Sequence, residues 1–431
     1  MKKTYIYTVS LFFFSMSSFA TPFKPDIAKN KKTHKTVNQT NVISQSQKSD
    51  LDYFPISYYS ALNKFKKIAR AIIDTNVTVT SESIAIPSKT DKDLEINYLN
   101  IPAQQPGADL IVLTSGVHGA EAYTGSAVQQ MFLNEILPQA DLNKIGFLII
   151  HSINPYGFKH FRRVDENNVD LNRNFPTNYS LYSMENQGYE SLSSLLGPTE
   201  PVKNPNCERV IKDLNLLQGL ALGKYSVKEI GDAIGQGQHK FPKGLEYGGI
   251  SPESQVLIVK EIVEKWSSQY RRIIFFDIHT GLGSKNQLHM MTGDGVAYKK
   301  NPLLQKILPL NVDGNNYDLA TGDDPGFYPT PGDIINYLPT LFTNNQETLA
   351  LTAEFGTIGT GTLNQIKTLN RLVLENQGFH YGYSDQVVQR GIEHDFHQLF
   401  LPEDPIWRTL VIEKARYVLT NIIDRLGDLK K

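Results

Sequence analysis

The 431-residue sequence contains a single cysteine, Cys207, so it cannot form an internal disulfide bond. Its fold must therefore depend on a hydrophobic core, and 40% hydrophobic residues in a chain of this length are enough to build a large one. The residues on either side of Cys207 form no nucleophile motif, and we interpret this thiol as structural.

A strong charge of either sign is also lacking. The 43 Lys and Arg residues nearly balance the 44 Asp and Glu residues, which gives a formal net charge of -1. A chain without a strong positive field has no general attraction for nucleic acids or acidic membrane surfaces. We therefore expect no nucleic-acid partner and a peptide or small molecule as substrate.

No hydrophobic run is long enough to anchor the chain in a membrane. The apolar stretch from Tyr5 to Phe14 has about half of the ~20 residues that a spanning helix needs. Lys2 and Lys3 precede it and Ser18 to Ala20 follow it, which is typical of a signal peptide over residues 1–20. Cleavage after Ala20 would leave no stable membrane anchor, so we expect an exported protein, periplasmic or secreted.

Two further regions differ from the rest of the chain in composition. Residues 21–50 are rich in Lys, Asn, Gln, Ser and Thr and are predicted to be a disordered polar linker. Residues 179–250 carry Pro, Gly and Gln without a regular pattern and are predicted to be a large insertion or lid. One folded domain is expected over residues 51–431.

Within that domain, short apolar or β-branched runs alternate with runs of helical spacing. This alternation predicts an α/β fold with a mixed, mostly parallel central sheet and helices on both faces. The predicted strands are Val77 to Ile86, Leu94 to Ile101, Leu110 to Thr114, Gly146 to His151, Ile273 to Ile278 and Leu349 to Phe355. The predicted helices are Leu62 to Ile73, Gly125 to Ile136, Pro252 to Tyr270, Leu363 to Asn376 and Trp407 to Leu426.

The first candidate site residues follow the strand predicted at Leu110 to Thr114. His118 and Glu121 lie three residues apart, and Gly116 and Gly119 relax the backbone around them. An imidazole and a carboxylate at this spacing can converge on one zinc ion.

A third ligand is available at the end of another predicted strand. His279 directly follows Ile273 to Ile278 and precedes a turn at Gly281. Active sites of parallel sheets lie at the carboxyl ends of the strands, so His279 is expected to complete a zinc site with one position open for water. The alternative is a core histidine bonded to Asp277 or to a backbone carbonyl.

One acidic residue, Glu354, interrupts the apolar strand predicted at Leu349 to Phe355. An unpaired charge in such a strand would be unfavourable, which indicates a chemical role. Partial desolvation would raise the pKa of Glu354 toward neutrality, as suits a general base that takes a proton from water and returns it to a leaving amine.

A charged cluster spans Arg162 to Phe175. Within it, Asn172 and Arg173 suit a grip on the terminal carboxylate of a substrate, because arginine binds carboxylates through two hydrogen bonds. A second arginine of the cluster could stabilise the oxyanion of a tetrahedral intermediate. The alternative is a solvated charged loop.

These clusters, in this order along the chain, resemble the zinc carboxypeptidase superfamily, typified by pancreatic carboxypeptidase A. The resemblance covers about residues 51–426 and implies that residues 51–431 are a catalytic domain. Glu354 matches the general base of that superfamily. One zinc ion is implied, held by three matching residues, His118, Glu121 and His279.

The resemblance also implies roles in the charged cluster. Asn172 and Arg173 match the pair that binds the substrate carboxylate. Arg163 matches the oxyanion arginine, with Arg162 as the second candidate. Asp170 matches the aspartate that orients the first histidine ligand.

Part of the insertion resembles a narrower bacterial branch, catalogued as a domain of unknown function. Its residues are Gly237-Gln238, Pro242 to Leu245 and Tyr247 to Gly249. That branch indicates little about the substrate. The digestive enzymes have a mobile active-site tyrosine upstream of the base, and here Tyr328 and Tyr337 both qualify, so neither is assigned.

Another group of histidines lies from Glu393 to His397. It could form a second metal-binding pair, but it has no partner motif. Its spacing also suits a solvated turn, which is the interpretation we favour.

Three functions remain open at this stage. The first is zinc-dependent hydrolysis of a peptide (amide) bond next to a free carboxylate, by a metallocarboxypeptidase or peptide amidase acting on peptides or cell-wall peptides. The second is an N-acyl amino acid deacylase of the aspartoacylase-like type, although those relatives usually end in a small β domain and Trp407 to Leu426 reads as a helix. The third is a catalytically inactive peptide-binding protein, which the complete set of ligands, base and arginines disfavours.

Overall fold

A computed structural model describes residues 50–74, 77–293, 301–309, 316–320, 330–342 and 345–429, without the side chains of residues 205–211. The predicted signal peptide, all but the last residue of the predicted linker, Tyr328 and the side chain of Cys207 lie outside this description. No helix among the described residues is long and apolar enough to cross a membrane.

The described residues form a sheet of eight strands in the order β1-β2-β4-β3-β5-β8-β6-β7. Neighbours in the central run β4-β3-β5-β8 are parallel, as are β6 and β7, and the other pairs are antiparallel. The predicted α/β class with a mixed, mostly parallel sheet is therefore confirmed. The strands are β1 (Thr80–Ala85), β2 (Glu95–Ile101), β3 (Asp109–Ser115), β4 (Ile145–His151), β5 (Arg272–Gly281), β6 (Leu288–Thr292), β7 (Asp318–Ala320) and β8 (Glu347–Gly356).

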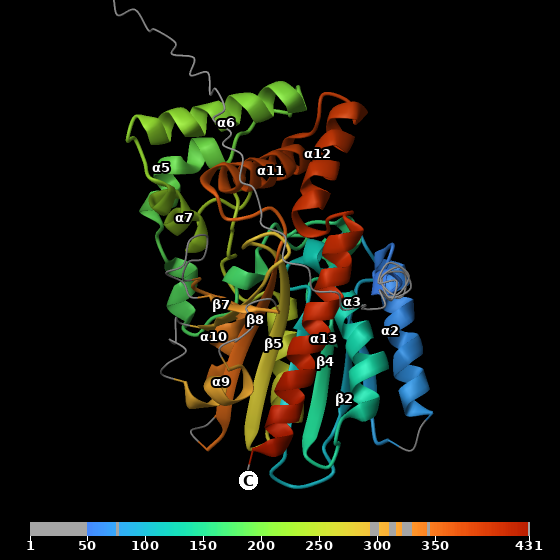
Figure 1. The fold of residues 1–431 in the computed structure, drawn as a ribbon. Coiled ribbons are helices and arrows are strands. Elements are labelled where there is room, and N and C mark those ends of the chain that lie inside the picture. The colour runs from blue at the N-terminus through green and yellow to red at the C-terminus, as the bar shows by residue number, and fades with distance from the viewer. Residues whose placement is uncertain are drawn as a thin grey trace, which may run out of the picture. The chain divides into compact units, whose positions relative to one another are not determined.

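Helices connect and cover these strands. Helices α2, α3 and α13 lie side by side on one face of the sheet (Figure 1), and the apolar side of α8 packs on the other face. The helices are α2 (Tyr58–Ile73), α3 (Ala122–Met131), α4 (Pro155–His160), α5 (Gln187–Leu196), α6 (Pro205–Ala221), α7 (Val227–Gly235), α8 (Ser254–Ser267), α9 (Pro302–Ile307), α10 (Ile334–Tyr337), α11 (Thr362–Tyr381), α12 (Gln386–Phe400) and α13 (Pro405–Asp428).

Successive side chains of the central strands enter two different cores. In β3, Ile111 and Leu113 belong to the core with α2, α3 and α13, whereas Leu110 and Val112 belong to the core with α8. Side chains alternate between the two faces of a strand, so a strand covered on both faces needs apolar residues at consecutive positions. This double burial explains the unbroken apolar runs of the sequence.

The predicted insertion, residues 179–250, contains α5, α6 and α7. They gather with α11 and α12 at one end of the sheet (Figure 1), where Tyr189 of α5, Ile230 of α7 and Ile366 of α11 share a small core. The hydroxyl of Thr280 in β5 donates to the carbonyl of Phe400 in α12 at 2.7 Å. These helices therefore lie at the carboxyl end of β5.

The interpretation of Glu393 to His397 as a solvated turn is wrong, because these residues lie inside α12. Phe396 is only 2% exposed and packs with Leu399 and Phe400. The side chain of Asp385 caps the helix by accepting the N–H groups of the two residues after Gln386.

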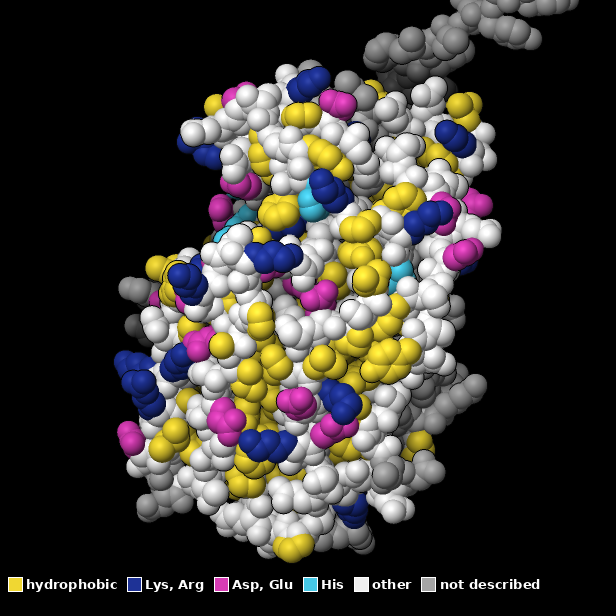
Figure 2. Space-filling view, turned by 180° about the vertical axis from the view of Figure 1, so that it is seen from behind, with side chains coloured by type: hydrophobic (Ala, Val, Ile, Leu, Met, Phe, Trp, Pro, Cys, Tyr) yellow, Lys and Arg dark blue, Asp and Glu magenta, His cyan; other side chains and the backbone are white. Residues whose placement is uncertain are grey.

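Acidic and basic side chains are interspersed on the face seen from behind, without a broad region of one charge (Figure 2). This distribution agrees with the balanced composition.

A close backbone contact fixes the loop that follows β3. The N–H of Gly119 donates to the carbonyl of Arg163, and the N–H of Ala120 donates to that of Arg162. A Cβ atom on Gly119 would lie 2.1 Å from the carbonyl carbon of Gly157 in α4, so only glycine fits there. The loop and α4 thus hold each other in place.

We predict that Gly119→Ala lowers the free energy of unfolding by about 1–3 kcal/mol or more, because the added methyl group has no space against α4. Gly427→Ala is the matched control, since nothing lies within 4 Å of its added methyl group and alanine favours the helix α13. Urea unfolding of both variants gives the comparison. A Gly119→Ala protein as stable as wild type would contradict the proposed contact.

Candidate metal centre

Three buried side chains converge where β3 and β5 end. His118 follows β3, Glu121 lies in the short helix η1 (Gly119–Glu121), and His279 belongs to β5. The carboxylate of Glu121 lies between the imidazoles, with Oε1 2.9 Å from Nδ1 of His118 and Oε2 3.1 Å from Nδ1 of His279. One ligand atom from each residue lies within 4.8 Å of the others, and no other such group occurs among the described residues.

The second nitrogen of each imidazole is held by an aspartate. Nε2 of His118 lies 3.1 Å from Oδ1 of Asp170, and Nε2 of His279 lies 2.6 Å from Oδ2 of Asp277. The Thr114 hydroxyl in turn donates to Asp277 at 2.5 Å. Such bonds keep the proton on Nε2 and aim Nδ1 at a metal. The bond from His279 to Asp277 is therefore compatible with a ligand role, because it uses the other nitrogen.

Two imidazole nitrogens and one carboxylate are a donor set that suits zinc and leaves a fourth position open. A carboxylate must be ionised to bind a metal. Burial alone would raise the pKa of Glu121, but His118 and His279 beside it hold that pKa well below its ordinary value. The backbone N–H of Thr280 also donates to Glu121, at 2.9 Å. The residues present therefore fit a zinc ion.

Glu354 lies beside this group on β8. It pairs with His279 in the parallel register of β5 and β8, so the two side chains share one face of the sheet. Burial raises the pKa of Glu354 to about 7, and the negative charge of Glu121 adds to the effect. The N–H of Leu282 donates to its Oε1 at 2.9 Å and fixes the carboxyl group.

Arg163 also reaches the group. Its Nη2 donates to Oδ2 of Asp170 at 3.0 Å, and its Nη1 lies 3.3 Å from Nδ1 of His118 and 3.7 Å from Oε1 of Glu121. Burial would raise the pKa of Asp170, but the charges of Arg163 and His118 hold it well below its ordinary range. Asp170 therefore stays ionised and links Arg163 to the first histidine.

Arg162 points elsewhere, although it is the neighbour of Arg163. It is buried, donates to Glu375 at 2.8 Å, and lies over the ring of Phe379, with Cζ 3.5 Å from the ring centroid. These contacts tie the loop to α11. Of the two arginines, Arg163 is the one that the fold brings to the candidate ligands.

Asn172 and Arg173, the residues predicted to bind a substrate carboxylate, contact other groups of the protein instead. Nη2 of Arg173 lies 2.9 Å from Oε2 of Glu246, and Nη2 of Arg163 donates to the same oxygen at 3.3 Å. Oδ1 of Asn172 accepts the N–H of Ile334 at 3.0 Å. Glu246 was not among the predicted site residues, although it lies between the segments that resemble the narrower branch.

Tyr337 is one of the two candidates for a mobile active-site tyrosine, and it lies in the hydrophobic core. Its ring lies in the core on the α8 side of the sheet and packs on Phe175, with centroids 5.4 Å apart. Burial raises the pKa of Tyr337 to about 12. No contact of Tyr337 with the candidate ligands occurs in the described part of the chain, and Tyr328 lies outside it.

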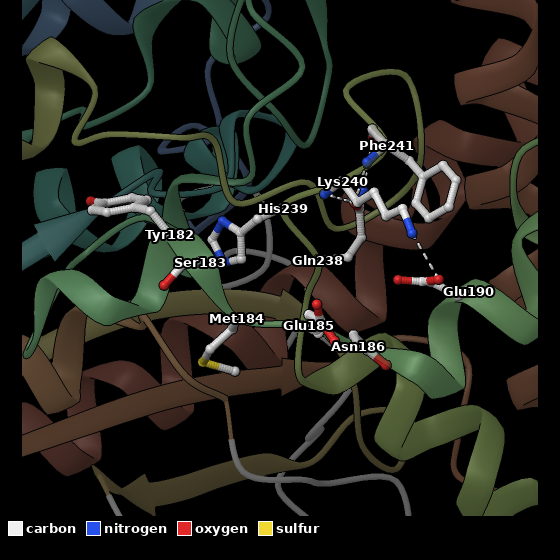
Figure 3. A pocket seen from close by; sticks show the side chains of 10 residues that line it. All are labelled: Tyr182, Ser183, Met184, Glu185, Asn186, Glu190, Gln238, His239, Lys240 and Phe241. Atoms are coloured by element: carbon white, nitrogen blue, oxygen red, sulfur yellow. Dashed lines mark hydrogen bonds and ion pairs between the residues drawn. The ribbon is translucent and has the colours of Figure 1, made fainter.

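The predicted insertion contains a pocket of about 260 Å³ (Figure 3). Residues 182–186, Glu190 and residues 238–241 line it, and an ion pair of 2.9 Å joins Lys240 to Glu190. None of the candidate ligands lines this pocket. Gln238 in its lining donates its backbone N–H to the carbonyl of Glu246, the residue that pairs with Arg163 and Arg173.

Two sequence comparisons bear on the chain. A family model described as "Protein of unknown function (DUF2817)" matches residues 54–414. No curated protein matches the sequence.

The chain is similar to several solved structures. Carboxypeptidase A from Helicoverpa armigera is 15% identical, with a TM-score of 0.43, over 85% of this chain and 81% of that chain. Bovine thrombin-activatable fibrinolysis inhibitor, in complex with tick carboxypeptidase inhibitor, is 15% identical, with a TM-score of 0.41, over 75% of this chain and 96% of that chain. Succinylglutamate desuccinylase from Chromobacterium violaceum is 13% identical, with a TM-score of 0.32, over 72% of each chain. Likeness at this level does not assign a reaction to this chain.

We predict that the purified protein carries about one zinc ion per chain, since the described residues contain one group of three candidate ligands. His118→Ala and His279→Ala should each lose the metal. His160→Ala, which removes a half-exposed imidazole bonded to Asp91, is the control that should keep it. Elemental analysis after dialysis measures all three, and full occupancy in both ligand variants would contradict the site.

Proposed function

The chain belongs to the family described as a protein of unknown function, DUF2817, and we propose that it is a zinc-dependent hydrolase of amide bonds, a metallopeptidase of the carboxypeptidase type. One observation carries this proposal: Glu121 joins the Nδ1 atoms of two imidazoles while Glu354 lies on the neighbouring strand with a pKa near 7. A metal ligand set beside a desolvated base is what hydrolysis of an unactivated amide requires.

A zinc ion held by these ligands would polarise a substrate carbonyl and make a water molecule more acidic. Glu354 takes the proton from the attacking water and delivers it to the leaving amine. A pKa near the working pH suits both transfers, because the group must accept and release a proton in each cycle. The bond from Leu282 holds the carboxyl group in one orientation for them.

Arg163 is proposed to stabilise the oxyanion that develops on the attacked carbonyl. Its guanidinium group is fixed by Asp170 and lies next to His118, so it needs no rearrangement at the moment of reaction. Its side chain is 18% exposed, whereas that of Arg173 is 4% exposed. Arg163 is thus the more accessible of the two guanidinium groups.

The substrates we propose are peptides or cell-wall peptides met after export. The signal-peptide pattern of residues 1–20 supports export, to the periplasm or the medium. A carboxypeptidase would use Asn172 and Arg173 to bind the terminal carboxylate. Because Arg173 already pairs with Glu246, cleavage next to a free carboxylate would require that ion pair to open.

We predict that Glu354→Gln keeps its zinc but loses about 10²-fold or more of its peptide hydrolysis, because glutamine cannot accept the proton of water. Glu347→Gln is the matched control, since Glu347 is half-exposed at the other end of β8, where it pairs with Arg272. Mass spectrometry of products from mixed peptides and muropeptides, with and without chelator, measures the loss. Near-normal turnover by Glu354→Gln would remove this residue from the mechanism.

A further inference from the structure

Glu246 takes no part in the proposed hydrolysis, yet it pairs with two arginines, Arg163 and Arg173, of the charged cluster. Its side chain is 3% exposed. Its Oε2 lies 2.9 Å from Nη2 of Arg173 in an ion pair and accepts from Nη2 of Arg163 at 3.3 Å. The two arginines that a carboxypeptidase would present to its substrate therefore share one carboxylate oxygen of the protein itself.

The backbone holds Glu246 in this position from both sides. Its carbonyl accepts the N–H of Gln238 at 2.9 Å, and the next carbonyl, of Tyr247, accepts the N–H of Asp170 at 2.7 Å. Glu246 has a φ of +53°, in the left-handed region that residues other than glycine and asparagine rarely adopt. Such a conformation persists where the surroundings impose it, and it often marks a functional position.

Arg173 is enclosed on two sides as well. A Cβ atom on Gly237 would lie 2.9 Å from Cδ of Arg173, and one on Gly332 would lie 2.6 Å from its carbonyl oxygen. The backbone therefore approaches this arginine as closely as glycine permits. An incoming carboxylate would have to replace Glu246 within this enclosed space.

Electrostatics oppose that replacement. With Glu246 ionised, the charges of Arg163 and Arg173 are balanced by Glu246 and Asp170. Burial favours the neutral form of Glu246 and raises its pKa, while the two guanidinium groups oppose that effect. A second carboxylate on Arg173 would lie beside the ionised carboxylate of Glu246, and two buried carboxylates in contact repel each other.

We propose that Glu246 permanently occupies the carboxylate position of this site. The substrates are then peptides with a neutral group beside the scissile bond, such as a continuing chain or an amidated end, rather than peptides with a free terminal carboxylate there. This inference rests on the proposed zinc-dependent hydrolysis and specifies its substrate class. Glu246 is in this account a specificity residue and not a catalytic one.

Binding to an inactive, zinc-loaded protein tests this without turnover. The probes are N-acetyl-alanyl dipeptides ending in alanine, lysine, glutamate or phenylalanine, each as the free acid and as the C-terminal amide. Calorimetry with the Glu354→Gln protein should show that no acid binds more tightly than its amide. Adding Glu246→Gln should tighten the acids about tenfold or more, because the arginines then carry an unbalanced charge, and change the amides much less.

Two further variants keep the result interpretable. Glu190→Gln, in the same background, removes the exposed pair with Lys240 near the same chain segment and should leave the ratio of acid to amide affinity unchanged. In Arg173→Met the acids should still bind no more tightly than the amides, because Glu246 then has one balancing guanidinium group fewer. The comparison of acids with amides in the Glu354→Gln protein needs no change at Glu246, so it remains the test if the Glu246 variant does not fold.

Several outcomes would overturn the inference. One is a Glu354→Gln protein that binds acids about tenfold more tightly than amides, because Glu246 then yields to the substrate. Others are an equal effect of Glu246→Gln on acids and amides, or no binding of any probe. Failure of the proposed function is seen separately, as a wild-type protein without zinc or without peptide hydrolysis.

Discussion

The structure depends on one buried carboxylate shared by two imidazoles. An ionised group inside a protein is tolerated only when it is paired and hydrogen-bonded, and Glu121 meets this condition through His118 and His279. Each imidazole is in turn held by an aspartate, Asp170 or Asp277, so that its Nδ1 atom faces Glu121. The arrangement requires β3 and β5 to be parallel neighbours, because only then do their carboxyl ends bring both histidines to one place.

Three further charged residues, Arg163, Arg173 and Glu246, lie beside this group. In the proposed account, Glu246 affects which substrate binds and takes no part in the hydrolysis. His279 and Glu354 stand on central strands that are covered on both faces, and His118 and Glu121 follow soon after another such strand, β3. Glu246 instead comes from the insertion, and its ion pairs with Arg163 and Arg173 join the insertion to the loop beside the centre. Under the proposed role of Glu246, a change of residue in the insertion would alter which substrate is accepted without moving Glu121 or Glu354. Folds of this kind commonly carry specificity on loops placed by a rigid scaffold.

Local sequence patterns predicted the features that depend on neighbours along the chain. The central strands were recognisable because burial on both faces demands consecutive apolar residues, and histidines or acids at their ends, such as His279 and Glu354, then stood out. Strands β6 and β7 were not predicted, because they are short and exist only through pairing with β8 and with each other. Helix α12 was missed although Val388, Ile392 and Phe396 recur at helical spacing. Glu246 had no local signal, because its partner Arg163 is 83 positions away in sequence.

The central claim is that two imidazoles and one carboxylate hold a zinc ion at the ends of β3 and β5. X-ray absorption spectroscopy at the zinc edge of the purified wild-type protein tests it most directly. The account predicts nitrogen and oxygen neighbours alone at about 2.0–2.2 Å, with the scattering pattern of two imidazole rings. A sulfur neighbour at about 2.3 Å, a spectrum without imidazole scattering, or a protein that binds no zinc would contradict it.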